Sequence, residues 1–194
     1  MKLTGATGSE FDIAGWQRRL AVAQKQSPAD LIIANGRIAN VFSGELIEGN
    51  VAIVDGLIAG IGDYRDAAET IDATGMVVAP SFIDAHIHIE PTHLWPTEFA
   101  RAVLPHGTGA IVSDAHEIAN VAGMPALEAF RSAVADLPLH VRWTIPSCVP
   151  ASPFESPGFA LGLDETAAAL HWPESGVLGE MMNFPGLLAG DETI

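Results

Sequence analysis

The stretch FIDAHIHIE, residues 82–90, places two histidines one residue apart at the end of an apolar run. Residues i and i+2 of a β-strand face the same side, so Asp84, His86 and His88 are expected to project together. Two imidazoles placed in this way can bind one metal ion through Nε2 atoms about 2.0–2.1 Å from it. Two histidines on a solvated strand face give the same H-x-H pattern, so the motif alone does not distinguish a metal site from an exposed strand.

The chain after Pro80 alternates apolar strands with helices. We expect strands at 81–89, 109–115, 140–147 and 176–182, and helices at 96–107, 124–137 and 163–172, the last with Asp164 as its cap. This β-α-β order predicts parallel strands joined by crossover helices. The fold class is therefore α/β, either half of a doubly wound sheet or about the first four strands of a (β/α)8 barrel. In this setting the H-x-H strand is expected to be buried.

The first 80 residues have a different texture. Residues 9–26 predict a peripheral helix, with Ser9 as its cap and Asp12 three residues later. From residue 30, short strands flank the turn signals Asn35-Gly36, Asp55-Gly56 and Thr74-Gly75. We therefore expect a helical extension at 1–29, a small β-sandwich segment at 30–80, and half of the barrel at 81–194.

Composition restricts the function classes. The net charge is −15, with 24 acidic residues against 9 Lys and Arg, so the surface repels phosphate backbones and nucleic acid is not expected as a partner. The single cysteine, Cys148, excludes a disulfide within the chain. The sequence contains no run of about 18 apolar residues, so no membrane span is expected, and the first residues do not resemble a signal peptide. Together these features favour a cytoplasmic protein with no membrane partner.

Polar residues gather at the carboxyl ends of all four expected strands, which is where parallel α/β folds bind ligands. Glu180 stands in an otherwise apolar strand, and its partner there is either a metal ion or an arginine. His116 and Glu117 either approach a metal or begin a helix that Asp114 caps, with Glu117 at its third position. Cys148 is interpreted as a packed or cavity-lining thiol. The strand-end residues are Asp84, His86, His88 and Glu90; Asp114, His116 and Glu117; Pro146, Ser147 and Cys148; and Glu180 and Asn183.

The segment VVAPSFIDAHIHIE (77–90) resembles the first-strand signature of the amidohydrolase superfamily. Four further segments are similar to the adenine deaminase family: EFARAVLPHGT (98–108), DAHEIANV (114–121), PSCVPAS (146–152) and GEMMNFPGLLAGD (179–191). Ser81 stands where the signature usually has Gly, and Ala115 where relatives usually have Pro. Both departures affect the backbone rather than a ligand.

The resemblance implies a (β/α)8 barrel with a composite β-sandwich and the hydrolysis of adenine to hypoxanthine and ammonia. It assigns His86, His88 and Glu180 as metal ligands, with two divalent ions per complete site, Mn²⁺ or Fe²⁺ and alternatively Zn²⁺. Asp84, Asp114, His116, Glu117, Ser147 and Asn183 are candidates for supporting the ligands or for the substrate loop. The family's two later histidines and its catalytic aspartate have no counterparts in the 194 residues, so no catalytic residue is assigned.

A purine base is the expected small-molecule partner, and a homo-oligomer is expected for the complete enzyme. The alternatives are another cyclic-amide hydrolase, similar to dihydroorotase or hydantoinase, and a half-barrel fragment without catalytic activity.

Overall fold

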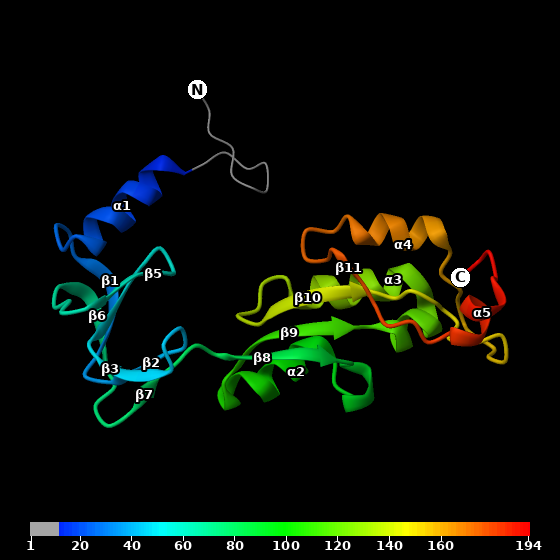
Figure 1. Cartoon of the computed structure of the whole chain (residues 1–194), viewed down its shortest axis with the longest axis horizontal. Helices are drawn as coiled ribbons and strands as arrows, with labels where there is room; N and C mark the ends of the chain where they lie inside the picture. The colour runs from blue at the N-terminus through cyan, green and yellow to red at the C-terminus, as the bar shows by residue number, and fades with distance from the viewer. Residues whose placement is uncertain (1–11) are drawn as a thin grey trace. The chain divides into compact units, whose positions relative to one another are not determined.

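A computed structural model describes residues 12–194 of the chain (Figure 1). The described residues divide between Pro80 and Ser81 into two compact units, one of mostly short strands and one of alternating strands and helices. No helix within residues 12–194 combines the length and the apolar character needed to cross a bilayer.

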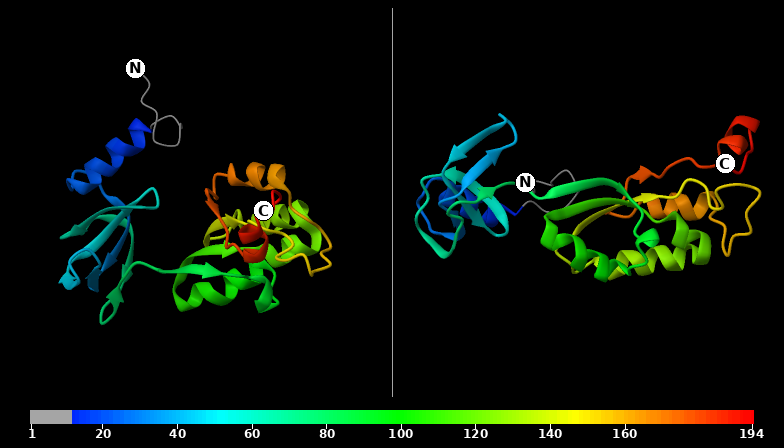
Figure 2. Two further views of the ribbon diagram at one scale, coloured as in Figure 1. Left: turned by 45° about the vertical axis from the view of Figure 1, so that its right-hand side comes forward. Right: turned by 90° about the horizontal axis from the view of Figure 1, so that it is seen from below.

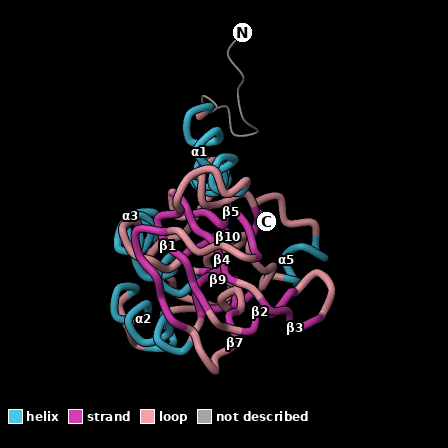
Figure 3. The backbone as a smooth tube through the Cα atoms, turned by 90° about the vertical axis from the view of Figure 1, so that its left-hand side faces the viewer, coloured by secondary structure: helices cyan, strands magenta, loops and turns pink. Residues whose placement is uncertain are grey.

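Helix α1 (Ile13–Ala23) begins the described chain. Its N-cap is Asp12, whose Oδ1 accepts a hydrogen bond from Gly15 N at 3.0 Å. The expected cap Ser9 lies outside the described residues. Val22 is buried with Ile32 and Val54 of the strands, and the helix contacts β4 and β5 (Figure 3). Val22 is the one buried residue of the helix, which agrees with the loose apolar face that the sequence predicts.

The first unit contains two sheets. The four-stranded sheet has the order β5-β4-β1-β6, and the three-stranded sheet has the order β3-β2-β7. Strand β1 pairs antiparallel with β4 and parallel with β6, and β2 pairs antiparallel with β3 and parallel with β7. The strands are β1 (Ala29–Ala34), β2 (Arg37–Asn40), β3 (Glu45–Glu48), β4 (Asn50–Val54), β5 (Leu57–Gly62), β6 (Ala67–Asp72) and β7 (Val77–Val78).

The three predicted turn signals have two different structural roles. Asp55-Gly56 closes a two-residue hairpin between β4 and β5, with φ of 52° and 72°, as a type I′ turn requires. Asn35-Gly36 and Thr74-Gly75 instead carry the chain from one sheet to the other. These two connecting segments lie side by side and are joined by backbone hydrogen bonds. Ala73 N donates to Ala34 O at 2.8 Å, and Arg37 N donates to Met76 O at 3.0 Å.

The second unit is built on a curled parallel sheet whose order, β11-β10-β9-β8, follows the chain. Helices α2, α3 and α4 connect successive strands and lie on one side of the sheet, as the right-hand view of Figure 2 shows. The predicted order of strands and helices is confirmed. The elements are β8 (Phe82–Ile87), α2 (Pro96–Val103), β9 (Thr108–Asp114), α3 (His116–Val134), β10 (His140–Ile145), α4 (Leu163–Leu170), β11 (Val177–Leu178) and α5 (Phe184–Ala189), with short 3-10 turns at Glu90–Thr92 and Leu104–His106.

The core of this unit lies between the sheet and its helices, where Phe99, Ile111, Phe130 and Trp143 are each less than 5% exposed. The expectation that β8 is buried is wrong. Phe82 and Ile83 expose 72% and 68% of their surfaces. Among the described residues β8 pairs only with β9, and the helices cover one face of the sheet, so its side chains lack neighbours on the other face.

Two predicted boundaries need correction. Helix α3 is not one of them: it consists of two helical segments that meet at a kink at Gly123 (φ 64°, ψ −149°), so the helix predicted from residue 124 is its second segment and the alternative of a helix start at His116 and Glu117 is its first. The N-cap of α4 is Gly162 and not Asp164. The strand expected at 176–182 is only Val177–Leu178. The last strand ends early because Glu180 N donates to Asp114 Oδ2 rather than continuing the pairing with β10.

Candidate metal centre

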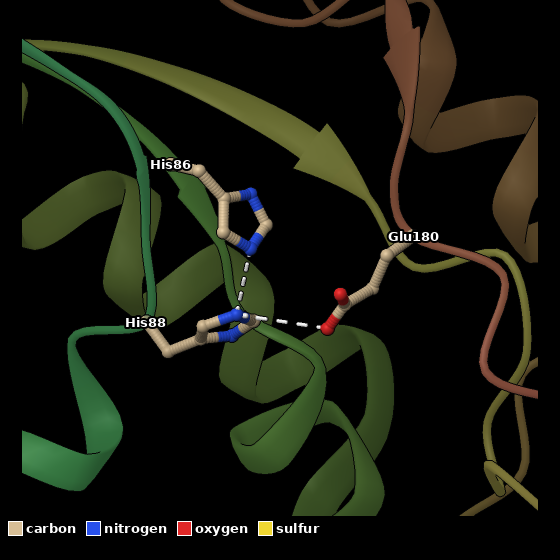
Figure 4. A group of neighbouring side chains, drawn as sticks. All are labelled: His86, His88 and Glu180. Atoms are coloured by element: carbon tan, nitrogen blue, oxygen red, sulfur yellow. Dashed lines mark hydrogen bonds and ion pairs between the residues drawn. The ribbon is translucent and has the colours of Figure 1, made fainter.

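The carboxyl ends of β8 and β9 and the segment after β11 bring six titratable side chains into one cluster. They form three overlapping groups whose potential ligand atoms lie within 4.8 Å of one another: His86, His88 and Glu180; His88, His116 and Glu117; and Asp114, His116 and Glu180. Figure 4 shows the first group, with both imidazoles and the carboxylate turned toward one another. Parallel strands in register place their carboxyl ends at one edge of the sheet, which is why distant residues meet here.

The two histidines of the H-x-H motif converge through their Nε2 atoms, which lie 2.9 Å apart. Strand β8 is irregular between Asp84 and Ile87, where two residues, Ala85 and His86, lie opposite the single residue Val112 of β9. His88 follows the last residue of the strand. Asp84 does not join the cluster, since it belongs to none of the three groups and its Oδ1 accepts from His86 N at 3.2 Å. The convergence therefore depends on a bulge as well as on the i, i+2 spacing.

Glu180 lies in the segment after β11, so its predicted place within a strand is wrong, and its side chain is 46% exposed. Its Oε1 is 3.6 Å from His88 Nε2 and 3.7 Å from His116 Nδ1. Both the backbone N–H and the backbone carbonyl of Glu180 are hydrogen-bonded to side chains. Glu180 N donates to Asp114 Oδ2 at 3.0 Å, and Ser147 Oγ donates to Glu180 O at 2.6 Å. The ion pairs of Glu180 in the described part of the chain are with histidines rather than an arginine.

Asp114 is the most deeply buried member of the cluster, with 1% of its surface exposed. It does not cap α3, whose N-cap is Ala115, and Glu117 is therefore the second helical residue rather than the third. Its Oδ1 lies 3.3 Å from His116 Nδ1. Gly179 allows this arrangement, because a Cβ there would lie 2.4 Å from Asp114 Oδ2.

The pair of Asp114 and His116 shifts both pKa values. The hydrogen bond with Asp114 raises the pKa of His116, with the nearby Glu117 and Glu180 carboxylates adding to the effect against desolvation. Burial by itself raises the pKa of Asp114, but hydrogen bonds from His116 and from Glu180 N outweigh burial and leave that pKa below its ordinary value. Both shifts favour the charged forms, an imidazolium facing a carboxylate.

Glu117 extends the cluster on the other side of His88. Its Oε2 lies 3.3 Å from His88 Nδ1 and 3.7 Å from His116 Nε2. Glu117 Oε2 and His88 Nδ1 are both buried, and neither makes a well-aligned hydrogen bond within residues 12–194. Such atoms are costly to bury unless a partner satisfies them.

The donor set fits a divalent metal ion. Ligand atoms that are each about 2.0–2.1 Å from one ion lie roughly 3.0–3.5 Å from one another. The measured separations of 2.9 Å between His86 Nε2 and His88 Nε2 and 3.6 Å between His88 Nε2 and Glu180 Oε1 are close to this range. Imidazole nitrogen with carboxylate oxygen suits Zn²⁺, Fe²⁺ or Mn²⁺. The distances among these side chains are therefore compatible with a shared divalent ion.

A cavity of about 400 Å³ adjoins the cluster and is lined by His116, Glu117, Asn120, Cys148 and Met182, among others. The Cys148 thiol is 4% exposed and accepts from Met182 N and Asn183 N at 3.3 and 3.4 Å, so it packs against the segment that follows Glu180. Asn183 caps α5 through Gly186 N and takes no part in the cluster. The cavity is large enough for a small heterocyclic molecule.

Two residues without a predicted role also lie here. Asn120 lines the cavity, and its Oδ1 is buried without a hydrogen-bond partner. Glu90 reaches from the loop after β8 to Ile118 N. Glu90 is among the strand-end residues that the sequence indicates, because it continues the spacing of two that runs from Asp84 through both histidines, but the sequence assigns it no role. Nothing in the local pattern around Asn120 indicates a cavity.

Part of the chain matches a known protein family. Residues 77–186 match the model of the amidohydrolase family. The chain belongs to the amidohydrolase family. The match covers more than half of the chain and contains both histidines of the motif together with Glu180.

Among curated members of this family, the adenine deaminase of Moorella thermoacetica is 49% identical over 180 residues. That alignment covers 90% of this chain and 30% of the relative. The adenine deaminase of Halalkalibacterium halodurans is 45% identical over 178 residues, 91% of this chain and 30% of the relative. The chain thus spans about 30% of the length of these two relatives.

A solved structure, the atrazine chlorohydrolase of Arthrobacter aurescens TC1 complexed with zinc, gives a TM-score of 0.61 at 17% identity. The likeness covers 84% of this chain and 51% of that one. At this identity it concerns the fold alone.

Proposed function

We propose that this chain carries the first part of the active site of an adenine deaminase, which hydrolyses adenine to hypoxanthine and ammonia. The identity of 45–49% to curated adenine deaminases over about 90% of the chain carries this proposal. In this proposal residues 30–80, which follow the helical extension, belong to a composite β-sandwich, and residues 81–194 form the first half of an eight-stranded (β/α)8 barrel.

The ligands in this proposal are His86 and His88 through Nε2 and Glu180 through its carboxylate. The distances among these atoms and the absence of an arginine partner for Glu180 within residues 12–194 support the assignment. The complete site holds two divalent ions, Mn²⁺ or Fe²⁺, with Zn²⁺ as the alternative. When bound, such an ion lowers the pKa of a water molecule and so supplies a nucleophile near neutral pH.

The remaining side chains of the cluster orient the ligands and hold protons. Asp114 keeps a proton on Nδ1 of His116 and also fixes the backbone of Glu180 through its N–H. Ser147 holds the carbonyl of the same residue. With both ends of Glu180 tied, its carboxylate has little freedom to turn away from the histidines.

The substrate is a purine base that enters the cavity beside His116 and Glu117. The net charge of −15 disfavours nucleic acid and leaves a free base as the partner. The complete enzyme is a cytoplasmic homo-oligomer in this proposal.

The test combines metal analysis with turnover. Purified chain is incubated with Mn²⁺, Fe²⁺ or Zn²⁺, bound metal is measured after removal of free ions, and ammonia release from adenine is followed. His88→Ala should lose metal and any activity together while its circular dichroism stays unchanged. His140→Ala is the matched control, because His140 is exposed at the opposite end of β10.

The outcomes separate the proposal from its alternatives. Metal binding with hydrolysis of a dihydropyrimidine or a hydantoin in place of adenine indicates another cyclic-amide hydrolase. Metal binding without any turnover indicates a half-barrel that holds ligands but does not catalyse. Full metal occupancy in His88→Ala contradicts the ligand assignment.

A further inference from the structure

The first turn of helix α3 carries two residues of the cluster, His116 and Glu117, but no side chain caps its N-terminus. Its N-cap is Ala115, which has no side chain that can accept a hydrogen bond. The first N–H groups of a helix have no partner inside the helix and need an acceptor from elsewhere. The first turn contains His116 and Glu117, so any looseness here moves two members of the cluster.

Glu90 supplies the missing acceptor from another segment. Its Oε1 accepts from Ile118 N, the third helical residue of α3, at 3.1 Å. Its second oxygen, Oε2, is buried without a hydrogen-bond partner among the described residues. The preceding residue, Ile89, is completely buried in the core, which anchors the backbone from which Glu90 reaches. A side chain 28 residues away in the sequence thus does the work of an N-cap.

The connection also runs in the opposite direction. Glu117, the neighbour of Ile118, places Oε2 3.3 Å from Nδ1 of His88, which lies two residues before Glu90. The two short segments 88–90 and 117–118 are therefore joined twice, once by a carboxylate from each side. Turning the first turn of α3 away from Glu90 would also move Glu117 away from His88.

We infer that Glu90 is a positioning residue, which holds the first turn of α3 so that Glu117 faces Nδ1 of His88. Nδ1 of His88 then carries the proton that points to Glu117, and Nε2 is left as the lone-pair nitrogen that faces His86 and Glu180 (Figure 4). Carboxylates that hold the second ring nitrogen of a metal-binding histidine fix both its orientation and its tautomer. This inference rests on the proposed metal site, which it deepens.

Three variants test the inference in the intact chain. Glu90→Ala removes the acceptor, and Glu90→Gln keeps a carbonyl oxygen for Ile118 N. Glu165→Ala is the matched control, because Glu165 Oε2 accepts from Gly162 N at 3.1 Å at the start of α4 and belongs to none of the three groups of the cluster. Both alanine variants remove a glutamate that accepts a backbone hydrogen bond at the start of a helix. Only α3, the helix that Glu90 contacts, carries residues of the cluster.

Co²⁺ serves as the probe, because it takes the same nitrogen and oxygen donors as Zn²⁺ and its visible spectrum reports the coordination. Glu90→Ala should weaken Co²⁺ binding about 10- to 100-fold and alter the visible bands. Glu90→Gln should restore both, and Glu165→Ala should bind Co²⁺ like the unmodified chain. Unchanged affinity in Glu90→Ala, or an equal loss in Glu165→Ala, overturns the inference.

Two measurements without metal separate this inference from the proposed function. In Glu90→Ala the Ile118 amide should exchange with solvent about five- to tenfold faster, as expected for one lost hydrogen bond. The ¹⁵N spectrum of His88 should shift from a single Nδ1–H tautomer toward a mixture. If the unmodified chain binds no Co²⁺, the proposed metal site fails. If the Ile118 amide and the His88 tautomer are unaffected in Glu90→Ala, the positioning role of Glu90 fails, whatever the metal result.

Discussion

Replacing Asp114 with asparagine should destabilise the second unit, because this carboxylate holds two parts of the cluster at once. Oδ2 accepts from Glu180 N at 3.0 Å, and Oδ1 faces His116 Nδ1 at 3.3 Å. The side chain is 1% exposed, so water cannot replace a lost partner. Asparagine has one acceptor and one donor, and it can serve only one of these two N–H groups.

The expected loss is that of one hydrogen bond to a charged acceptor, about 2 kcal/mol of unfolding free energy. For a chain of this length, about 2 kcal/mol corresponds to a fall in Tm of about 4–8 °C. The pH dependence has a definite sign. Because the folded-state pKa of Asp114 is below its ordinary value of 3.8, its contribution to stability is present above that value and is lost as pH falls through the folded pKa.

Urea unfolding of the metal-free chain at pH 7 measures the difference, followed by tryptophan fluorescence, since three of the four tryptophans lie in residues 81–194. The control is Asp164→Asn, at an exposed position in the first turn of α4, for which a change within about 0.5 kcal/mol is expected. An Asp114→Asn midpoint equal to that of the control would refute the reasoning. So would an acid-unfolding profile with the slope of the unmodified chain.

Two further substitutions test the same region. Gly179→Ala places a Cβ 2.4 Å from Asp114 Oδ2 and should cost at least about 1–3 kcal/mol in thermal unfolding. Gly44→Ala, with no atom within 4 Å of the new Cβ, should cost only the strain of its positive φ, about 1–2 kcal/mol, and leave the Co²⁺ spectrum unchanged. Asn183→Ala removes the cap that accepts from Gly186 N and should lower the unfolding free energy by about 1 kcal/mol, measured by urea unfolding, and an unchanged midpoint would contradict it.

Much of the second unit could be predicted from residues 81–194. The alternation of apolar runs with amphipathic segments predicts the order of β8–α2–β9–α3–β10–α4–β11, which the structure confirms. The two-residue turn at Asp55-Gly56 is likewise a local signal, because its positive φ values suit Gly and Asp. The start of α3 at His116 is one of two alternatives that the sequence leaves open, because the pair His116 and Glu117 suits both a helix start and an approach to a metal ion.

The candidate site divides in the same way. The H-x-H spacing and the single carboxylate Glu180 are visible in the sequence, and so are the polar ends of four strands. The length of the last strand is not, because the Glu180 N–H turns to Asp114 instead of continuing the ladder with β10. The residues next to Glu180 in the sequence do not indicate that its N–H donates to Asp114, which lies 66 residues earlier.

The sequence by itself determined the kinds of side chain available as ligands and the order of the elements that carry them. Only the tertiary structure decided that His88 faces Glu117 and Glu180, and that Glu90 completes the start of α3. The physical reason is that residue type and periodicity act over a few residues. The distances between strand ends depend instead on sheet register, on the bulge in β8 and on hydrogen bonds between distant segments.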